Sequence, residues 1–207
     1  MTMVRKQLRP AIVMTVLLCV MTGAVYPGVV TGLAQLLFAR QANGSLVTVN
    51  GTVVGSALIG QAFTKPYYFH PRPSAAGTGY DATASGGTNK GPTDRKLADS
   101  MIAPRIAEVI ASTGVAKGAV PADMVTASAS GLDPHISPAN AFLQVGRVAR
   151  ARGADSAAVR RIVDAHVERR QFGVFGEPRV NVLLLNIALD SSFPTFARAS
   201  VTTGLTH

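Results

Sequence analysis

The fold of this chain depends first on residues 11–39, which read AIVMTVLLCVMTGAVYPGVVTGLAQLLFA. The stretch carries no charged residue, and the next charge along the chain is Arg40. A helix needs about 20 apolar residues to cross a hydrocarbon core about 30 Å thick, and this stretch is longer. We therefore predict a transmembrane helix over about Leu8 to Thr31 that continues as a juxtamembrane helix to residue 39. Pro27 is expected to kink or unwind it locally.

Two other interpretations of the stretch are weaker. A buried core helix would show a polar face somewhere, and none is present. A cleaved signal peptide would use small residues at a cleavage site, which Thr22-Gly23-Ala24 and Gly32-Leu33-Ala34 both offer. The apolar run is, however, about twice the usual length of a signal core, and it contains no Ala-x-Ala. Retention as a membrane anchor is therefore favoured.

The charges beside the stretch predict its orientation. Arg5, Lys6 and Arg9 precede it without any acidic residue to offset them, whereas only Arg40 follows closely. Positive flanks stay in the cytoplasm. Residues 1–10 are thus predicted to be a cytoplasmic basic tail, residues 11–39 the transmembrane helix and its extension, and residues 40–192 an extracytoplasmic domain.

Composition limits what this domain binds. The chain has 20 Lys and Arg against 11 Asp and Glu, a formal net charge of +9. Such a balance suits nucleic acid, anionic lipid or an acidic protein partner. An extracytoplasmic location excludes nucleic acid and leaves membrane lipid or protein. Cys19 is the only cysteine, so no intrachain disulfide is possible.

The domain shows a mixed pattern of strands and helices. Asn50-Gly51 between two β-rich runs predicts a hairpin over residues 46–54. Ser137 before Pro138, and Asp155 further along, predict the starts of two helices. Three further segments complete the pattern: a long loop to Pro92, a helix over 93–112 kinked at Pro104, and a buried strand over 180–189. We expect a single α+β domain with a small sheet, followed by a flexible tail over residues 193–207.

Sequence motifs for catalysis are missing. There is no Gly-x4-Gly-Lys-Ser/Thr, no Asp-Lys-Thr-Gly and no Gly-x-Ser-x-Gly. The dinucleotide-like Gly77 to Ala82 neither follows a predicted strand nor opens a predicted helix. The sequence therefore predicts no catalytic residue, no metal site and no cofactor bound by this chain. The arginines of the two later helices predict a solvated basic face or a docking surface: Arg147, Arg150, Arg152, Arg160, Arg161, Arg169 and Arg170.

Several motifs together are distinctive. They include Tyr26-Pro27-Gly28, Phe69-His70-Pro71-Arg72-Pro73-Ser74-Ala75, Ser85-Gly86-Gly87-Thr88-Asn89, Ala127 to Ser137 (ASASGLDPHIS) and Gly176 to Leu183 (GEPRVNVL). In order and spacing, from Arg9 to about Asp190, the chain resembles the C subunits of the Kdp-type high-affinity potassium-transporting ATPases of bacteria. Thr88, Lys90 and Asp81 depart from the usual pattern of these subunits.

This resemblance implies a bacterial inner-membrane complex with a channel-like A subunit, an ATP-hydrolysing B subunit and a very small F subunit. The C subunit is non-catalytic, and ATP and K⁺ are handled by the partner subunits. Assembly of the complex and a raised ATP affinity of the B subunit are the roles it implies. Gln144 lies in a family-like segment and is a candidate for nucleotide contact. Because the predicted domain lies outside the cytoplasm, we expect any effect on ATP affinity to be indirect.

The resemblance and the turn-rich motifs also suggest where partners bind. We expect the loop from Arg72 to Asn89 and the turn from Gly131 to His135 to dock on the A subunit, and Pro27 to mark an intramembrane contact. The interface candidates are Pro27, Arg72, Pro73, Ser74, Ser85, Gly86, Gly87, Asn89, Asp133, Pro134 and His135. The alternative function is an independent membrane-anchored envelope scaffold or binding domain that uses its basic face.

Overall fold

The computed structural model describes residues 2–194, with the side chains of residues 2–5 left aside. The chain divides into two compact units, Met1–Val54 and Gly55–His207, and each is described by itself. The predicted tail over residues 193–207 falls, beyond Pro194, outside the described residues.

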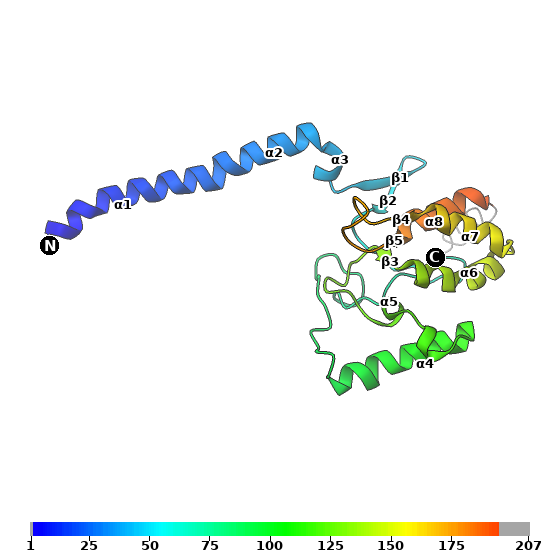
Figure 1. Ribbon diagram of the computed structural model, residues 1–207. Coiled ribbons are helices and arrows are strands. Elements are labelled where there is room, and N and C mark those ends of the chain that lie inside the picture. Colours follow the sequence, from blue (N-terminus) through cyan, green and yellow to red (C-terminus); the bar gives the residue numbers. More distant parts are fainter. Residues whose placement is uncertain (1, 195–207) are drawn as a thin grey trace, which may run out of the picture. The chain divides into compact units, whose positions relative to one another are not determined.

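The first unit is dominated by a long apolar helix. Helix α1 (Thr2–Val20), a π-helical turn (Met21–Val25) and helix α2 (Tyr26–Leu37) follow one another without a break, as Figure 1 shows. Within it, Lys6–Leu37 is long and apolar enough to cross a membrane, and none of its hydrophobic window is buried. The predicted single span is therefore present as a helix that the described residues leave uncovered.

The distortion expected at Pro27 lies in the turn before it. Proline has no N–H to donate, and its ring would collide with the carbonyl four residues earlier, here that of Gly23. A π-helical turn relieves this collision because it adds one residue to the turn. The Tyr26 N–H accordingly bonds to the carbonyl of Met21, and the Thr22 hydroxyl donates to the Leu18 carbonyl at 2.7 Å. The helix is widened locally and continues through Pro27.

A short helix and a hairpin complete the first part of the chain. Helix α3 (Ala39–Ala42) precedes strands β1 (Leu46–Val49) and β2 (Thr52–Ser56), which form a two-stranded sheet. The turn residues Asn50 and Gly51 have φ of 50° and 80°. These values fit a type I′ turn and confirm the predicted hairpin.

The core of the second unit lies between three helices and a small sheet. Helices α6 (Pro138–Arg152), α7 (Ser156–Ala165) and α8 (Val182–Ser192) pack together. The two predicted N-caps are confirmed: Ser137 Oγ accepts from Asn140 N at 3.1 Å, and Asp155 Oδ1 accepts from Ala157 N at 3.1 Å. The core side chains are Phe69, Ile136, Ala141, Val145, Val148, Ala149, Val159, Val163, Val180, Val182, Leu185 and Leu189.

The sheet of this unit has three short antiparallel strands. Strand β5 (Arg179–Asn181) is central, between β3 (His135–Ile136) and β4 (Val167–Glu168). Val180 faces Ile136 on one side and Val167 on the other. The predicted α+β class with a small sheet is confirmed.

The predicted buried strand over residues 180–189 is wrong. Only Arg179–Asn181 is a strand, and the chain then turns into helix α8. Asn181 starts that helix, because its Oδ1 accepts from Leu184 N at 3.2 Å. A continuously apolar run fits a buried helix and a buried strand equally well, so periodicity could not separate them.

The segment before this core alternates between helical and irregular stretches. A π-helical stretch (Lys96–Ile102) leads into α4 (Ala103–Thr113), where Pro104 stands in the first turn. The predicted helix over 93–112 with an irregularity at Pro104 is thus confirmed in outline. A 3₁₀ turn (Lys117–Ala119) and the short helix α5 (Ala122–Val125) follow.

Candidate functional site

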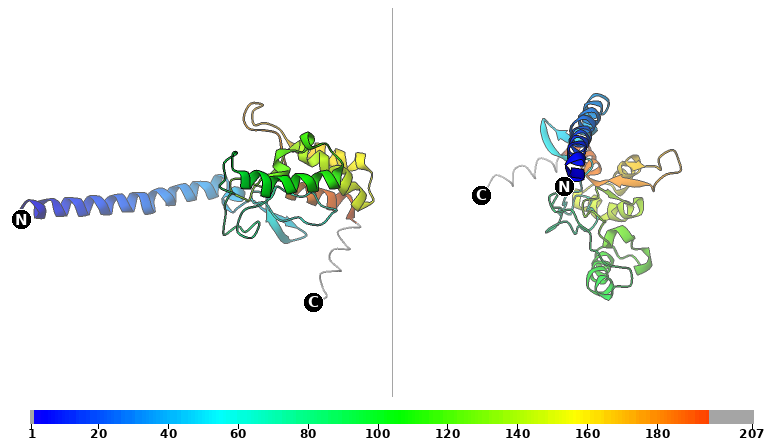
Figure 2. Two further views of the ribbon diagram at one scale, coloured as in Figure 1. Left: turned by 90° about the horizontal axis from the view of Figure 1, so that it is seen from below. Right: turned by 90° about the vertical axis from the view of Figure 1, so that its left-hand side faces the viewer.

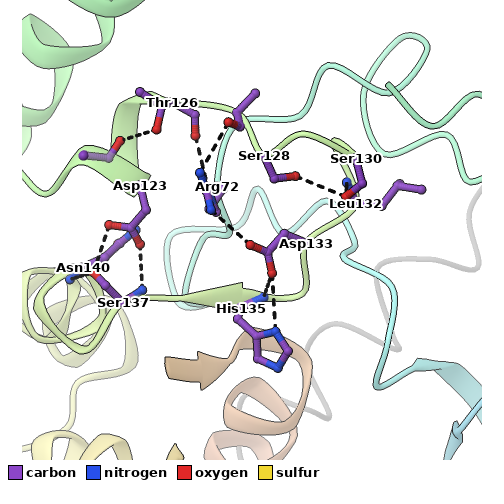
Figure 3. Close-up of polar contacts among 12 residues, drawn as sticks. Arg72, Asp123, Thr126, Ser128, Ser130, Leu132, Asp133, His135, Ser137 and Asn140 are labelled. Carbon is purple, nitrogen blue, oxygen red and sulfur yellow. Dashed lines mark hydrogen bonds and ion pairs between the residues drawn. The ribbon is translucent and has the colours of Figure 1, made fainter. Parts of the chain in front are cut away.

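The two predicted docking segments lie against each other in the second unit. Arg72 Nη1 is 3.1 Å from Asp133 Oδ2, and its other nitrogens face the carbonyls of Thr126 and Ala127 at 3.5 and 3.4 Å. Asp133 Oδ1 accepts from the backbone N–H of His135 at 3.0 Å (Figure 3). Arg72 therefore joins the long loop to the turn that carries Asp133.

The charge of Asp133 is stabilised by this arrangement. Burial alone raises the pKa of its carboxyl, because a charged group loses hydration. Hydrogen bonds from His135 and the positive charge of Arg72 outweigh this and hold the pKa below its ordinary value. Asp133 is thus the ionised centre of the contact between the two segments.

Ser74 and Gly131 form the tightest part of the same contact. Ser74 Oγ donates to the Gly131 carbonyl at 2.6 Å and accepts from the N–H groups of Ala76 and Tyr80 at 3.2 and 2.8 Å. Gly131 has φ of 67°, and a Cβ there would lie 2.6 Å from both Ala76 N and Gly86 O. Only glycine fits this position without moving backbone.

The remaining interface candidates differ in their surroundings. Ser85 Oγ and Gly86 N both donate to the Ser130 carbonyl, at 3.0 and 2.9 Å, and a Cβ on Gly87 would lie 2.9 Å from Ala129 O. Asn89 is exposed, with φ of 51°, whereas Pro134 is buried.

Two candidates lie elsewhere. Pro73 lines a cavity described below, and Pro27 belongs to the apolar helix of the first unit. The structure therefore joins most of the candidates on the loop and the turn into one rigid region.

A second polar system holds the extended segment Tyr67–His70. Asn186, on α8, accepts from Phe69 N at 2.8 Å and donates to Phe69 O at 3.0 Å. Gln144, on α6, does the same to His70, at 2.8 and 3.0 Å. Two side-chain amides thus satisfy a buried backbone segment that no strand pairs with. We call this arrangement the amide clamp, consisting of Asn186, Gln144 and the segment Tyr67–His70.

Arginines of α6 reinforce the amide clamp. Arg147 donates to the carbonyls of Pro66 and Tyr68 at 2.5 and 3.0 Å. Arg152, whose side chain is 0% exposed, donates to Tyr67 O at 2.7 Å and pairs with Asp190 at 2.8 Å.

These two arginines correct the predicted solvated basic face. A guanidinium can bond several carbonyls at once, so both turn toward the domain. Sequence reasoning also missed Asn186 and Asn140. The available signal was an amide inside an apolar helical run, because a polar group buried there needs a partner.

The hydrogen-bonding groups of the Gln144 side chain all have partners within the domain. This residue is 2% exposed. Its Oε1 accepts from His70 N at 2.8 Å and from Arg147 at 2.6 Å, and its Nε2 donates to His70 O at 3.0 Å and Asn140 Oδ1 at 2.7 Å. An amide oxygen has two lone pairs and an amide nitrogen two hydrogens, so its capacity is filled. A nucleotide could bond to Gln144 only by displacing one of these partners.

A cavity of about 520 Å³ lies beside these two systems. Its walls come from α4, α6 and the segment Ala62–Pro73, and they include Arg72, Pro73, Tyr80, Arg105, Glu108, Gln144 and Arg147. Three guanidinium groups and one carboxylate give it a positive balance, which suits an anionic group.

Burial sets the protonation of two groups that line this cavity. Burial and the neighbouring Arg147 lower the pKa of His70, against the opposing effects of the Lys65 carbonyl and Glu108. Burial lowers the pKa of Arg147 to about 10. At neutral pH we therefore expect an uncharged imidazole next to charged guanidinium groups. Among the described residues, no group of three or more His, Cys, Asp or Glu side chains could hold a metal ion.

Comparison with known proteins identifies the family. Residues 8–191 match the model of a family described as "KdpC: K+-transporting ATPase, c chain". The chain belongs to this family.

Relatives named "Potassium-transporting ATPase KdpC subunit" agree along almost the whole sequence. One from Gemmatimonas aurantiaca is 64% identical over 187 residues, which cover 90% of this chain and 93% of the relative. One from Rhodospirillum rubrum is 56% identical over 189 residues, covering 91% and 97%. The family resemblance seen in the sequence is confirmed, and with it a place in a potassium-transporting ATPase.

Proposed function

We propose that this chain is a non-catalytic subunit that assembles and stabilises an ATP-driven potassium uptake complex in a bacterial inner membrane. Its partners are the A, B and F subunits, which handle K⁺ and ATP. One observation carries this proposal: the helix Lys6–Leu37 is long and apolar enough to cross a membrane, and none of its apolar window is buried by the rest of the described chain. Such a helix can be covered by lipid and by neighbouring membrane helices.

The orientation of the domain is part of the same proposal. The basic residues Lys6 and Arg9 stand before the uncharged stretch 11–39, so the N-terminus stays in the cytoplasm and the domain is exported. A phosphatase fused to the C-terminus and active only when exported tests this. Activity of a fusion that works only in the cytoplasm would reverse the assignment.

We propose that the rigid region made by the loop Arg72–Asn89 and the turn at Asp133 docks on the A subunit. Internal bonds hold the region in one shape, so docking there loses little conformational entropy. Asn89→Arg places a bulky charge on its exposed edge, and it is expected to reduce recovery of the A subunit when the complex is purified. Ser191→Arg, on the exposed side of α8, is the matched control.

Two outcomes would contradict this docking. Equal recovery of the A subunit and equal potassium uptake by the two variants would remove the region from the interface. A chain that is stable and monodisperse alone, and that never recovers larger membrane subunits, would favour the independent envelope scaffold.

An effect on ATP affinity is proposed to be indirect. The amide of Gln144 is filled by partners inside the domain, and the proposed topology separates the domain from cytoplasmic ATP. The apolar helix with its π-helical turn before Pro27 is the element able to contact membrane-embedded subunits. It would act through a conformational equilibrium that is shifted both by the contacts of this helix and by ATP binding.

A further inference from the structure

The segment between β4 and β5 carries exposed apolar side chains at its end. Phe172 is 94% exposed, Val174 69% and Phe175 66%. In both views of Figure 2 this segment projects away from the rest of the described residues 55–194. We call these three side chains the apolar tip. Exposed aromatic groups gathered at one place on a domain usually mark a contact surface.

The segment that bears the apolar tip is held in an ordered shape. Two ion pairs cross its base: Arg170 to Glu177 at 2.7 Å and Arg179 to Glu168 at 2.9 Å. Above them, Gln171 and Phe175 form a β-bridge. The tip is therefore presented on a small hairpin-like projection.

The backbone at Phe172 is unfavourable for the residue it carries. Phe172 has φ of 53° and Gly173 has φ of 77°. Positive φ at the first of these positions is normally taken by Asn, Asp or Gly, because a large side chain crowds the carbonyl. Turn formation alone does not explain a phenylalanine here. An exposed aromatic ring at a strained position indicates that the ring itself is used.

The charges around the apolar tip are positive or neutralised. Arg169 and Arg170 stand directly before it, and Arg170 is the one that pairs with Glu177, so the net positive charge near the tip is that of Arg169. The nearest carboxylates, Glu168 and Glu177, are each paired with an arginine. An apolar end with a net positive charge just behind it is the arrangement by which proteins enter the boundary between lipid headgroups and acyl chains.

The size of the tip also favours lipid over protein. A stable protein interface buries about 800 Å² on each partner. A large aromatic side chain buries about 150–250 Å², so two phenylalanines and a valine fall short of that area. The membrane also limits how far the domain can move away: Gly55 follows Leu37, where the apolar helix ends, by 18 residues, which span about 65 Å at most at about 3.3–3.6 Å per residue.

We propose that Phe172, Val174 and Phe175 insert into the headgroup region of the bilayer that the apolar helix spans, with Arg169 at the level of the lipid phosphates. The inference applies on either side of the membrane, so it does not rest on the proposed orientation. It gives the domain a second membrane contact besides the helix. The tether raises the local concentration of lipid, so even weak insertion is populated.

Spin-labelled lipid tests this proposal on the full chain. Cys19 is the only cysteine, so a Cys19→Ser background allows one label to be placed at will. Val174→Cys carries an environment-sensitive fluorophore between the two phenylalanines, and Ser191→Cys, at an exposed position of α8, is the matched control. Each chain is reconstituted alone in phosphatidylethanolamine and phosphatidylglycerol vesicles with or without lipid spin-labelled near the headgroup.

The expected result is at least twofold quenching of the label at 174, and little at 191. Adding Phe172→Ser and Phe175→Ser should bring quenching at 174 down to the control level, with unchanged circular dichroism. Equal quenching at the two positions in the chain alone would overturn the proposal. So would a label at 174 that responds only after the partner subunits are added and is then shielded from the lipid quencher, because the tip would then bind protein.

Discussion

Replacing Gln144 by methionine separates a structural role from a nucleotide-binding role. Methionine has nearly the volume of glutamine and no strong hydrogen-bonding group, so the substitution removes the bonds without opening a large cavity. It leaves the N–H and the carbonyl of His70 without their partners in the amide clamp. It also removes an acceptor from Arg147 and a donor from Asn140.

The expected loss of stability follows from these groups. A buried polar group left without a partner costs about 1–3 kcal/mol. Two backbone groups of His70 are affected, and this residue is half-buried, so water can partly replace the lost bonds. We therefore expect the free energy of unfolding to fall by about 3 kcal/mol. For a domain of this size, that corresponds to a Tm lower by about 6–12 °C.

The assay is urea unfolding of the full chain in detergent, monitored by the near-ultraviolet circular dichroism of its tyrosines. Gln41→Leu, at an exposed glutamine of the first unit, is the control and should change stability by less than about 0.5 kcal/mol. In the assembled complex, the KM for ATP should change only to the extent that this subunit is lost from the complex. A stable Gln144→Met chain whose complex assembles normally but binds ATP more weakly would refute the reasoning and assign Gln144 to nucleotide contact.

Four further substitutions test other contacts. Gly131→Ala should cost about 2–3 kcal/mol, because its Cβ would meet backbone atoms at 2.6 Å and its φ is 67°. Asp190→Ala should cost about 3 kcal/mol, since it leaves the buried Arg152 guanidinium without its carboxylate, whereas Glu177→Ala at the exposed pair should cost under about 1 kcal/mol. Stability should fall as pH drops below about 6.5 in the unmodified chain, and less steeply in His70→Gln.

The structure also provides a control for Gly131→Ala and the direction of the pH effect at His70. Gly91→Ala, where a Cβ would meet nothing within 4 Å, should be nearly neutral. For His70 the folded-state pKa lies below the unfolded one, so the unfolded chain binds the proton first as pH falls. The stabilisation is therefore complete above the unfolded pKa and is lost through the folded pKa. Denaturant midpoints measured from pH 7.5 to 5 report it, and identical slopes in the two chains would contradict the assignment.

The amide clamp shows what local sequence patterns cannot supply. Gln144 lies in α6 and Asn186 in α8, and both bond to a segment more than 70 residues earlier in the chain. Periodicity marks them only as polar residues in apolar helices. Their partners become known once the helices are packed, because the bonds depend on tertiary distance. The same holds for Arg152, which the sequence placed on a solvated face and the structure buries.

The apolar stretch and the family were determined by the sequence alone. The stretch needed only a count of uncharged residues, because the cost of charge in hydrocarbon does not depend on the rest of the fold. Helix α6 and its cap at Ser137 were also predictable, since N-caps act within one turn. Tertiary structure decided the rest. It turned residues 182–192 into a helix, locked Arg72 to Asp133, and left Phe172 in the open. These outcomes depend on which surfaces meet, and a continuous apolar run or a lone turn residue carries no information about its neighbours in space.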